Sequence, residues 1–308
     1  MLFSRKSLGL EIGSSGVAFA LLGGSVTLPR LERVSYRPFD PGVIRTSLRE
    51  QNILDTDAFI RNVKDAYNTL LHPGPRISVT LPDTVGHILL LDMEGRFKSR
   101  SEGIDMIRWK LKKNIPFDVA DTHLDYQQLS IRENGDMALL VALVSRRVMG
   151  QYEESLVAAG LVPSRIDFNS FNLYRTFEQR LASLEQCALV SYFDNILGIM
   201  IFSNGIPEFV RVKELAGTPA VDSRVFMEIT NSFLVHHERF PERVMQNIAC
   251  VAPPDVSTGF CDMVAEAAGS TPVLLEAKAA VTPSDEAPAD QASLFPFTAA
   301  IGSALRSL

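Results

Sequence analysis

Short apolar strands alternate with amphipathic helices along the 308 residues of this chain. Residues 8–11 and 17–22 predict two strands, because both are short apolar runs that flank a tight turn of small residues at 13–16. Apolar residues spaced three and four apart between Phe59 and Leu71 predict an amphipathic helix, which Asp55 or Thr56 can cap. Similar patterns predict further strands near 77–81, 85–91, 124–128, 137–144, 187–191, 196–202 and 248–252, and further helices near 104–111, 146–159, 171–184, 225–234, 259–268 and 299–308.

Two segments about half a chain apart have the same predicted order of elements. Residues 8–25 and 188–205 both consist of a strand, a sharp turn, a second strand and a glycine-containing turn. Strands and helices alternate in both halves, and the chain is too long for one ordinary core. We therefore expect two related α/β lobes. Residues 277–292, rich in Ala, Pro, Ser and Asp, are expected to form a loose surface loop.

The charge balance excludes some classes of partner. Lysine and arginine number 30 against 36 aspartate and glutamate residues, so the net charge is −6 and no nucleic-acid partner is expected. No run of about 18 apolar residues occurs, so we expect membrane association only through partners. The most basic stretch, residues 108–113, could contact anionic lipid or an acidic partner. A solvated helix face with Trp109 partly packed is the favoured interpretation.

Several motifs follow one another along the chain in a recognisable order. The opening hairpin has the sequence Leu8-Gly9-Leu10-Glu11-Ile12-Gly13-Ser14-Ser15-Gly16-Val17, and residues 1–6 precede it. The central motifs are Ile107-Arg108-Trp109, Ile115-Pro116-Phe117-Asp118, Leu124-Asp125-Tyr126-Gln127, Val144-Ser145-Arg146-Arg147, Ala158-Ala159-Gly160-Leu161 and Ile166-Asp167-Phe168-Asn169-Ser170-Phe171. A last motif is Phe226-Met227-Glu228-Ile229-Thr230-Asn231-Ser232-Phe233. Together they cover most of the chain and resemble the PilM family of type IV pilus assembly proteins, within the actin-like ATPase superfamily.

The resemblance implies an actin-like, two-lobed α/β fold with duplicated βββαβα-type subdomains and an inserted strand–helix–strand–strand–helix subdomain, 1C. Lobe 1 would span 1–184, with subdomain 1A at 1–82 and 163–184 and 1C at 83–162. Lobe 2 would span 185–308, with 2A at 185–220 and 249–308 and the small 2B at 221–248. FtsA and the cytoplasmic part of the secretion protein GspL are implied as distant relatives.

The resemblance also implies a function in the inner-membrane platform that assembles type IV pili. The protein would be cytoplasmic and peripheral at the inner-membrane face, and it would bind the cytoplasmic tail of a PilN-like membrane protein. An extended tail would lie in a groove between 1A and 1C. Other pilus platform proteins are implied as further partners. This scaffold is the favoured hypothesis. An FtsA-like polymer is disfavoured, because no terminal membrane-binding helix is visible.

The nucleotide site that the resemblance implies begins with a nearly intact loop. Glu11, Gly13, Ser14, Ser15 and Gly16 match the first phosphate loop, in which glycines allow backbone N–H groups to approach phosphate. Glu11 stands where the family usually has aspartate. Ala18 stands where PilM commonly has lysine, so one positive charge is absent.

The other two nucleotide elements depart further from the family. Ser191 and Phe193 fall on the places of an aspartate and a glycine, and Asp194 could replace the lost carboxylate only if the register shifts. Pro253 and Pro254 remove N–H donors from the third element. We expect no catalytic residue, no metal and no cofactor, since each lost critical donor raises a phosphoryl-transfer barrier by roughly 2.7–4 kcal/mol. The alternative is an ATP-binding protein or ATPase that acts as a switch, with magnesium near Glu11 and Asp194.

Overall fold

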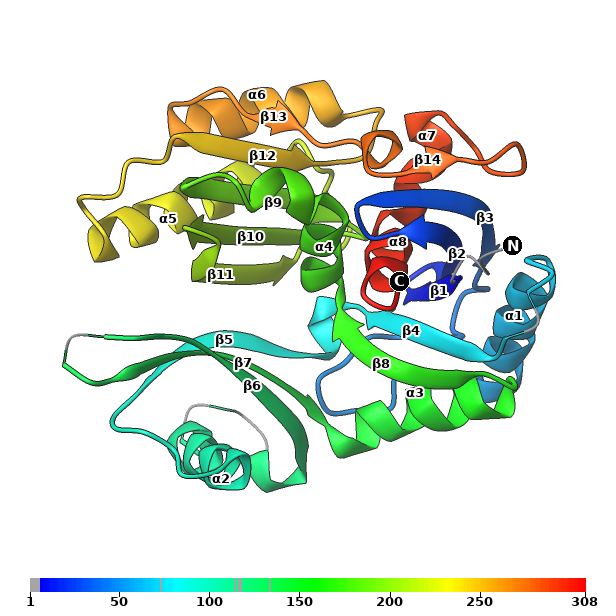
Figure 1. Cartoon of the computed structure of the whole chain (residues 1–308), viewed down its shortest axis with the longest axis horizontal. Helices are drawn as coiled ribbons and strands as arrows, with labels where there is room; N and C mark the ends of the chain where they lie inside the picture. The colour runs from blue at the N-terminus through cyan, green and yellow to red at the C-terminus, as the bar shows by residue number, and fades with distance from the viewer. Residues whose placement is uncertain (1–5, 73, 114, 116–117, 133) are drawn as a thin grey trace.

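The computed structural model contains two large sheets side by side and a third, small sheet (Figure 1). It describes residues 6–72, 74–113, 115, 118–132 and 134–308. The motif residues 1–5, Pro116 and Phe117 lie outside the described residues.

The strands and helices follow in chain order. The first large sheet and its helices comprise β1 (Ser7–Ile12), β2 (Gly16–Ser25), β3 (Leu28–Pro38), α1 (Thr56–Asn68), β4 (Arg76–Leu81), β8 (Val162–Phe168) and α4 (Asn169–Leu181). Between β4 and β8 come η1 (Asp83–Val85), β5 (Gly86–Met93), α2 (Arg100–Leu111), η2 (Val119–Asp121), β6 (Thr122–Ile131), β7 (Met137–Ser145) and α3 (Arg146–Ala158). The remainder comprises β9 (Gln186–Phe193), β10 (Ile196–Ser203), β11 (Ile206–Glu214), α5 (Ser223–Arg239), β12 (Asn247–Val251), α6 (Ser257–Ala268), β13 (Val273–Leu274), η3 (Ala277–Ala279), β14 (Thr282–Pro283), α7 (Gln291–Leu294), η4 (Phe295–Phe297) and α8 (Thr298–Leu305).

The two large sheets share one topology. β1 pairs antiparallel with β2 and parallel with β4, which pairs parallel with β8. In the same way, β9 pairs antiparallel with β10 and parallel with β12, which pairs parallel with β13. The strand orders β3-β2-β1-β4-β8 and β11-β10-β9-β12-β13 are therefore equivalent. This equivalence explains the repeat in the sequence and confirms the predicted α/β fold class with two related lobes.

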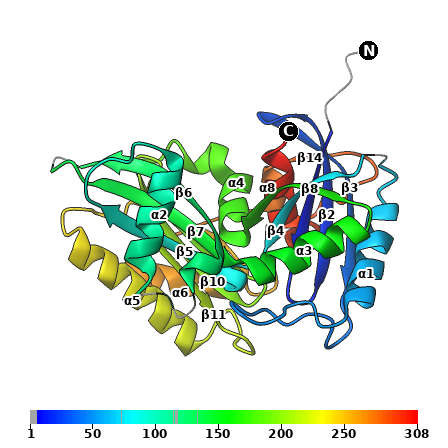
Figure 2. The ribbon, with the colours of Figure 1, turned by 90° about the horizontal axis from the view of Figure 1, so that it is seen from below.

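The small sheet has the order β5-β7-β6, and α2 covers one of its faces (Figures 1 and 2). Alternate residues of β7, namely Leu139, Val141 and Leu143, are buried in a cluster with Ile107 and Leu111 of α2. The β7 residues between them are only half-buried. Side chains alternate across a strand, so the face away from α2 is directed toward the large sheets.

The C-terminal segment is not the loose loop that its composition predicted. Ala277 and Val281 are buried, and β14 pairs with β3 at the edge of the first large sheet. Helix α8 then lies between the two large sheets together with α4 (Figure 1). Its eight residues are all buried. The residue boundaries of the predicted lobes and subdomains stay a prediction.

Candidate functional site

Two hairpin turns from different lobes meet at one point. Ser14 lies in the turn between β1 and β2, and Asp194 lies in the two-residue turn between β9 and β10. The Ser14 N–H donates to Asp194 Oδ2 at 2.6 Å, and the Ser14 hydroxyl donates to Asp194 Oδ1 at 2.6 Å. We call Glu11, Gly13, Ser14 and Asp194 the interlobe seam.

Asp194 reaches the first loop from the turn of its own hairpin. Ser191 pairs with Gly198, and Phe193 pairs with Ile196, so Asp194 and Asn195 form the turn itself. Both have left-handed backbone angles, with φ of 50° and 61°. Two positive φ values are the geometry of a type I′ hairpin turn, which Asp and Asn tolerate better than most residues. The hairpin therefore presents the Asp194 carboxylate to the first loop.

Glu11, near the end of β1, is the second carboxylate of the seam. Its side chain is buried, and a Cβ on Gly13 would lie 2.8 Å from Glu11 Oε1 and 3.2 Å from Asp194 Oδ2. Burial and then the nearby Asp194 raise the pKa of Glu11 well above its usual value, although hydrogen bonding with Asn169 lowers it. Burial also raises the pKa of Asp194, which the hydrogen bonds from Ser14 lower. Two carboxylates thus share a poorly solvated site that glycine leaves open.

Ser15 and Gly16 face a different neighbour. The Ser15 hydroxyl lies 3.4 Å from the Tyr36 hydroxyl on β3. A Cβ on Gly16 would meet the Arg37 carbonyl oxygen at 2.5 Å and the Tyr36 hydroxyl at 2.6 Å. The structure therefore brings Glu11, Gly13, Ser14 and Asp194 together, whereas Ser15 and Gly16 pack against β3.

The structure also shows where the residues expected at the second nucleotide element lie. Ser191 is buried, and its hydroxyl donates to the Gly198 carbonyl at 3.3 Å. The Phe193 ring packs into the core against Phe295, with centroids 5.4 Å apart, and so occupies a core position rather than the space over the loop. The seam fits a magnesium nucleotide poorly, because Ser14 already binds a carboxylate and the third element begins with two prolines.

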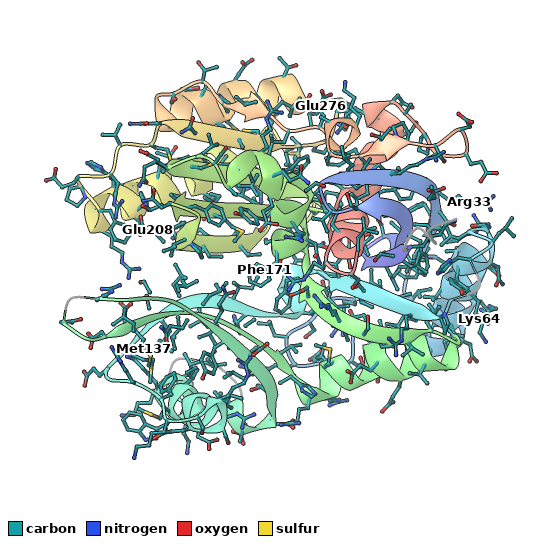
Figure 3. The ribbon with its side chains drawn as sticks, viewed as in Figure 1. Arg33, Lys64, Met137, Phe171, Glu208 and Glu276 are labelled. Carbon is teal, nitrogen blue, oxygen red and sulfur yellow. The ribbon has the colours of Figure 1, made fainter. Side chains whose placement is uncertain are left out.

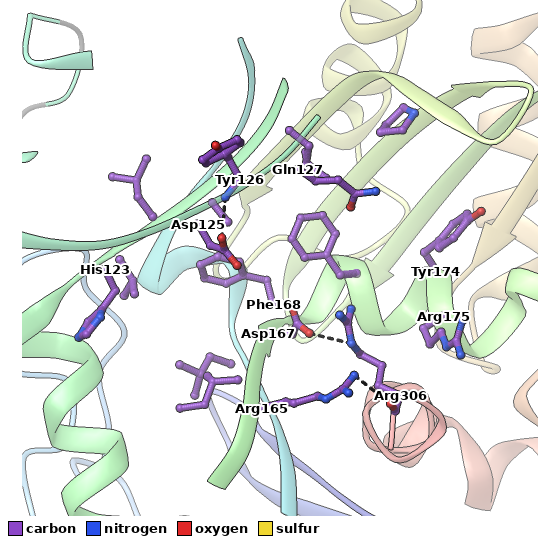
Figure 4. Close-up of a pocket in the computed structure, with 18 of the residues that line it drawn as sticks. His123, Asp125, Tyr126, Gln127, Arg165, Asp167, Phe168, Tyr174, Arg175 and Arg306 are labelled. Carbon is purple, nitrogen blue, oxygen red and sulfur yellow. Dashed lines mark hydrogen bonds and ion pairs between the residues drawn. The ribbon is translucent and has the colours of Figure 1, made fainter. Parts of the chain in front are cut away.

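A groove of about 930 Å³ opens between the small sheet, β8 and α4 (Figure 4). Residues 123–129 of β6 and 163–168 of β8 line it as continuous runs. Within the described residues, β6 pairs only with β7, and β8 pairs only with β4. The groove is therefore bordered by two strands that each have a free edge.

Aromatic and apolar residues form the inner wall of the groove. Phe168 lies beside Phe171, with centroids 6.4 Å apart, and Tyr174 stacks on Phe202 at 4.6 Å. Figure 3 shows Phe171 where the three sheets approach one another. On the opposite wall, Gln127 is exposed and points from β6 toward α4 (Figure 4). An apolar wall with a few polar groups is typical of a ligand-binding cleft.

Ion pairs hold the rim of the groove. Arg306 binds Asp167 on β8 with 3.0 Å between Nε and Oδ2, and Arg165 donates to the Arg306 carbonyl at 3.0 Å. Burial raises the pKa of Asp167, whereas Arg306 and Arg165 lower it. Arg175 pairs with Glu178 on α4. The rim arginines are thus positioned by the chain itself before any ligand arrives.

The groove residues were not identified as a site from the sequence, although a signal was present. The motifs at 124–127 and 166–171 carried much of the family resemblance, and both line this groove. They come together only because β6 and β8 border the same space. The sequence signal for this groove was therefore the pair of family-like motifs on the edge strands β6 and β8.

The basic end of α2 is more exposed than predicted. The Trp109 side chain is 81% exposed rather than partly packed.

In the described part of the chain, no helix is long and apolar enough to cross a lipid bilayer.

Comparisons with known proteins identify the fold. No protein-family model matches the sequence, and no curated protein matches it. A chain of the solved PilM–PilN type IV pilus biogenesis complex is similar in structure, with a TM-score of 0.82 and 20% identity over 97% of this chain and 98% of that one. The cytoplasmic domain of EpsL, an inner membrane component of the type II secretion system of Vibrio cholerae, matches with a TM-score of 0.54 and 11% identity over 99% of this chain and 96% of that one. The chain therefore shares its fold with a chain of the PilM–PilN complex, as the resemblance implied.

Proposed function

We propose that this protein is a scaffold of the inner-membrane platform that assembles type IV pili. In this proposal it binds the cytoplasmic tail of a PilN-like membrane protein in the groove between β6 and β8. The observation that carries the proposal is structural similarity over nearly the whole chain to a protein solved in a PilM–PilN complex. The groove supports it, because its shape and its free strand edges suit an extended segment.

The tail would bind by adding a strand. The edge of β8 that faces the groove has no strand partner among the described residues, so its backbone groups are available for ladder hydrogen bonds. Alternate side chains of an extended peptide would then point to opposite sides. One set would contact the wall formed by Phe171 and Tyr174, and the other set would face Gln127 and Ala142. Main-chain bonds would supply affinity, and these contacts would supply specificity.

We further propose a cytoplasmic protein that reaches the inner membrane through this partner, alongside other platform proteins. In this proposal the nucleotide site is degenerate, and the protein needs no ATP to bind the tail. The occupied donors of Ser14 and the prolines at 253 and 254 support that part.

The alternative is an ATP-gated switch in pilus or type II secretion assembly. The specific observation in its favour is that the buried Glu11 lies near the half-buried Asp194, since two adjacent carboxylates could hold magnesium through water. Calorimetry with ATP and magnesium separates the two: heat of binding supports the switch, and its absence while the tail still binds supports the scaffold.

A binding assay tests the proposal with one blocking variant and one matched control. The probe is a fluorescent peptide with the cytoplasmic tail sequence of a PilN-like protein, and a scrambled peptide is the reference. Gln127→Trp places a bulky ring in the groove, whereas Gln246→Trp makes the same change at an exposed position outside it. We expect Gln127→Trp to weaken tail binding by on the order of tenfold or more, and Gln246→Trp to leave it unchanged. Equal binding by both variants, or no preference over the scrambled peptide, would count against the groove.

A further inference from the structure

The turn residue Asp194 binds the first loop through its side-chain carboxylate. Its carboxylate accepts from both the backbone N–H and the hydroxyl of Ser14, a residue 180 positions away in the other lobe. Both bonds are 2.6 Å long, and short bonds are typical of an ionised acceptor. Two hydrogen bonds between the turns of two hairpins therefore join the lobes at this point.

This contact has the chemistry of an oxyanion in a glycine loop. Such loops bind phosphate because backbone N–H groups and small hydroxyl side chains converge on anionic oxygens. A carboxylate offers two such oxygens and one negative charge. Here the space comes from Gly13, since a Cβ at this position would lie within 3.2 Å of Asp194 Oδ2. The chain thus supplies the kind of group that a bound phosphate would otherwise supply.

The residues around Ser14 favour the Asp194 carboxylate over a phosphate as the anion at this loop. Glu11 is buried beside Asp194, and burial together with the Asp194 charge raises its pKa. The direction of this shift reflects the repulsion between the two neighbouring carboxylates, in addition to burial. A phosphate that replaced Asp194 at Ser14 would bring more negative charge close to the buried Glu11.

We propose that Asp194 is a specificity-determining residue that occupies the first phosphate loop as an internal anion. It holds the two lobes together without nucleotide and excludes phosphate groups from Ser14. The inference does not depend on tail binding, because the seam and the groove share no residue. Tail binding measured on the same variants therefore distinguishes a failure of one proposal from a failure of the other.

Hydrogen exchange of the first loop in the full-length protein tests this inference. The main variant is Asp194→Ala. The control is Asn195→Ala, which changes the other left-handed residue of the same turn but leaves the carboxylate in place. We expect the Ser14 amide to exchange on the order of tenfold faster in Asp194→Ala than in Asn195→Ala. Inorganic phosphate should slow this exchange again in Asp194→Ala and should have no effect on the wild type.

Two results would overturn the inference. One is equal exchange of Ser14 in Asp194→Ala and Asn195→Ala. The other is protection of residues 13–16 in the wild type by ATP and magnesium, which would show that Asp194 yields to nucleotide. If Asp194→Ala does not fold, Asp194→Asn serves instead: its amide keeps one acceptor and the same volume. Faster exchange of the Ser14 amide in Asp194→Asn than in Asn195→Ala then supports the inference, and equal exchange in these two variants contradicts it.

Discussion

The Asp83 carboxylate accepts hydrogen bonds from both the backbone N–H and the hydroxyl of Ser170, at 3.1 Å and 2.9 Å. Asp83 begins the short helix that precedes the small sheet, and Ser170 lies in the first turn of α4. Both residues are buried. The bond therefore joins the start of the small-sheet segment to the first large lobe, next to the groove.

The stability of the protein should depend on the protonation of Asp83. Burial raises the pKa of this carboxyl from 3.8 to about 6, although the bonds from Ser170 lower it. The folded protein therefore holds this proton more tightly than the unfolded chain. The resulting stabilisation is complete below about pH 4 and is lost as the pH rises through about 6.

Asp83→Asn removes this titration and keeps an acceptor for Ser170. We expect the free energy of unfolding of the wild type, minus that of Asp83→Asn, to fall by about 3 kcal/mol between acid and neutral pH. Urea denaturation of both proteins across this range measures the difference. Parallel stability curves for the two proteins would contradict the assignment.

Two helix glycines should respond in opposite ways to a methyl group. A Cβ on Gly302 of α8 would lie 1.8 Å from the Asn172 carbonyl oxygen, so α8 and α4 must separate to accept it. We expect Gly302→Ala to lower the free energy of unfolding by about 3 kcal/mol. Gly150 of α3 has only Glu154 Oε1 within 4.0 Å, so Gly150→Ala should raise stability by about 1 kcal/mol through helix propensity. Denaturant unfolding measures both, and similar changes would show that α8 is not packed this closely.

The two faces of α2 should differ sharply in their effect on stability. Ile107 is fully buried against the small sheet, and Trp109 is 81% exposed. We expect Ile107→Ala to cost about 3 kcal/mol, because it leaves a cavity. Trp109→Ala should change stability by no more than about 0.5 kcal/mol. A large loss for Trp109→Ala would mean that this side chain is covered by another part of the chain.

The ion pair at the rim of the groove should control the acidity of Asp167. Arg306 lowers the pKa of this carboxyl, which burial raises. Removing the guanidinium in Arg306→Ala should therefore raise the pKa of Asp167. The matched change Arg61→Ala, on the exposed surface of α1, should leave it unchanged. Carbon NMR of the Asp167 carboxyl during a pH titration measures the shift, and equal values in both variants would exclude the pair.

Much of the fold follows from local patterns in the sequence. The helix expected from Asp55 onward is α1, and Asp55 accepts from the Ala58 N–H as an N-cap does. The strands β3 and β11 were missed, because charged residues such as Arg33 and Arg211 interrupt their apolar pattern at half-exposed positions. Strand β8 contains Pro163 and is an edge strand, where proline is tolerated.

Tertiary context decided what local patterns could not. The segment 277–292 has the composition of a loop, yet Ala277 and Val281 are buried because the first large sheet offers a surface for them. The contact of Asp194 with Ser14 depends on how two lobes pack, which no spacing along the chain reveals. The groove likewise needs β6 and β8, from two different sheets, to border the same space. Local patterns in the sequence indicate which residues are candidates for a site, whereas the tertiary fold determines which of them are in contact.

Hydrogen exchange of the full-length protein with and without the PilN-like tail peptide tests the central claim most directly. The bound peptide should slow the exchange of backbone amides in residues 123–129 and 163–168, because β6 and β8 border the groove with free edges. The exchange of residues 13–16 should stay unchanged. Protection confined to residues outside the groove, or no protection at saturating peptide, would contradict the proposed scaffold function.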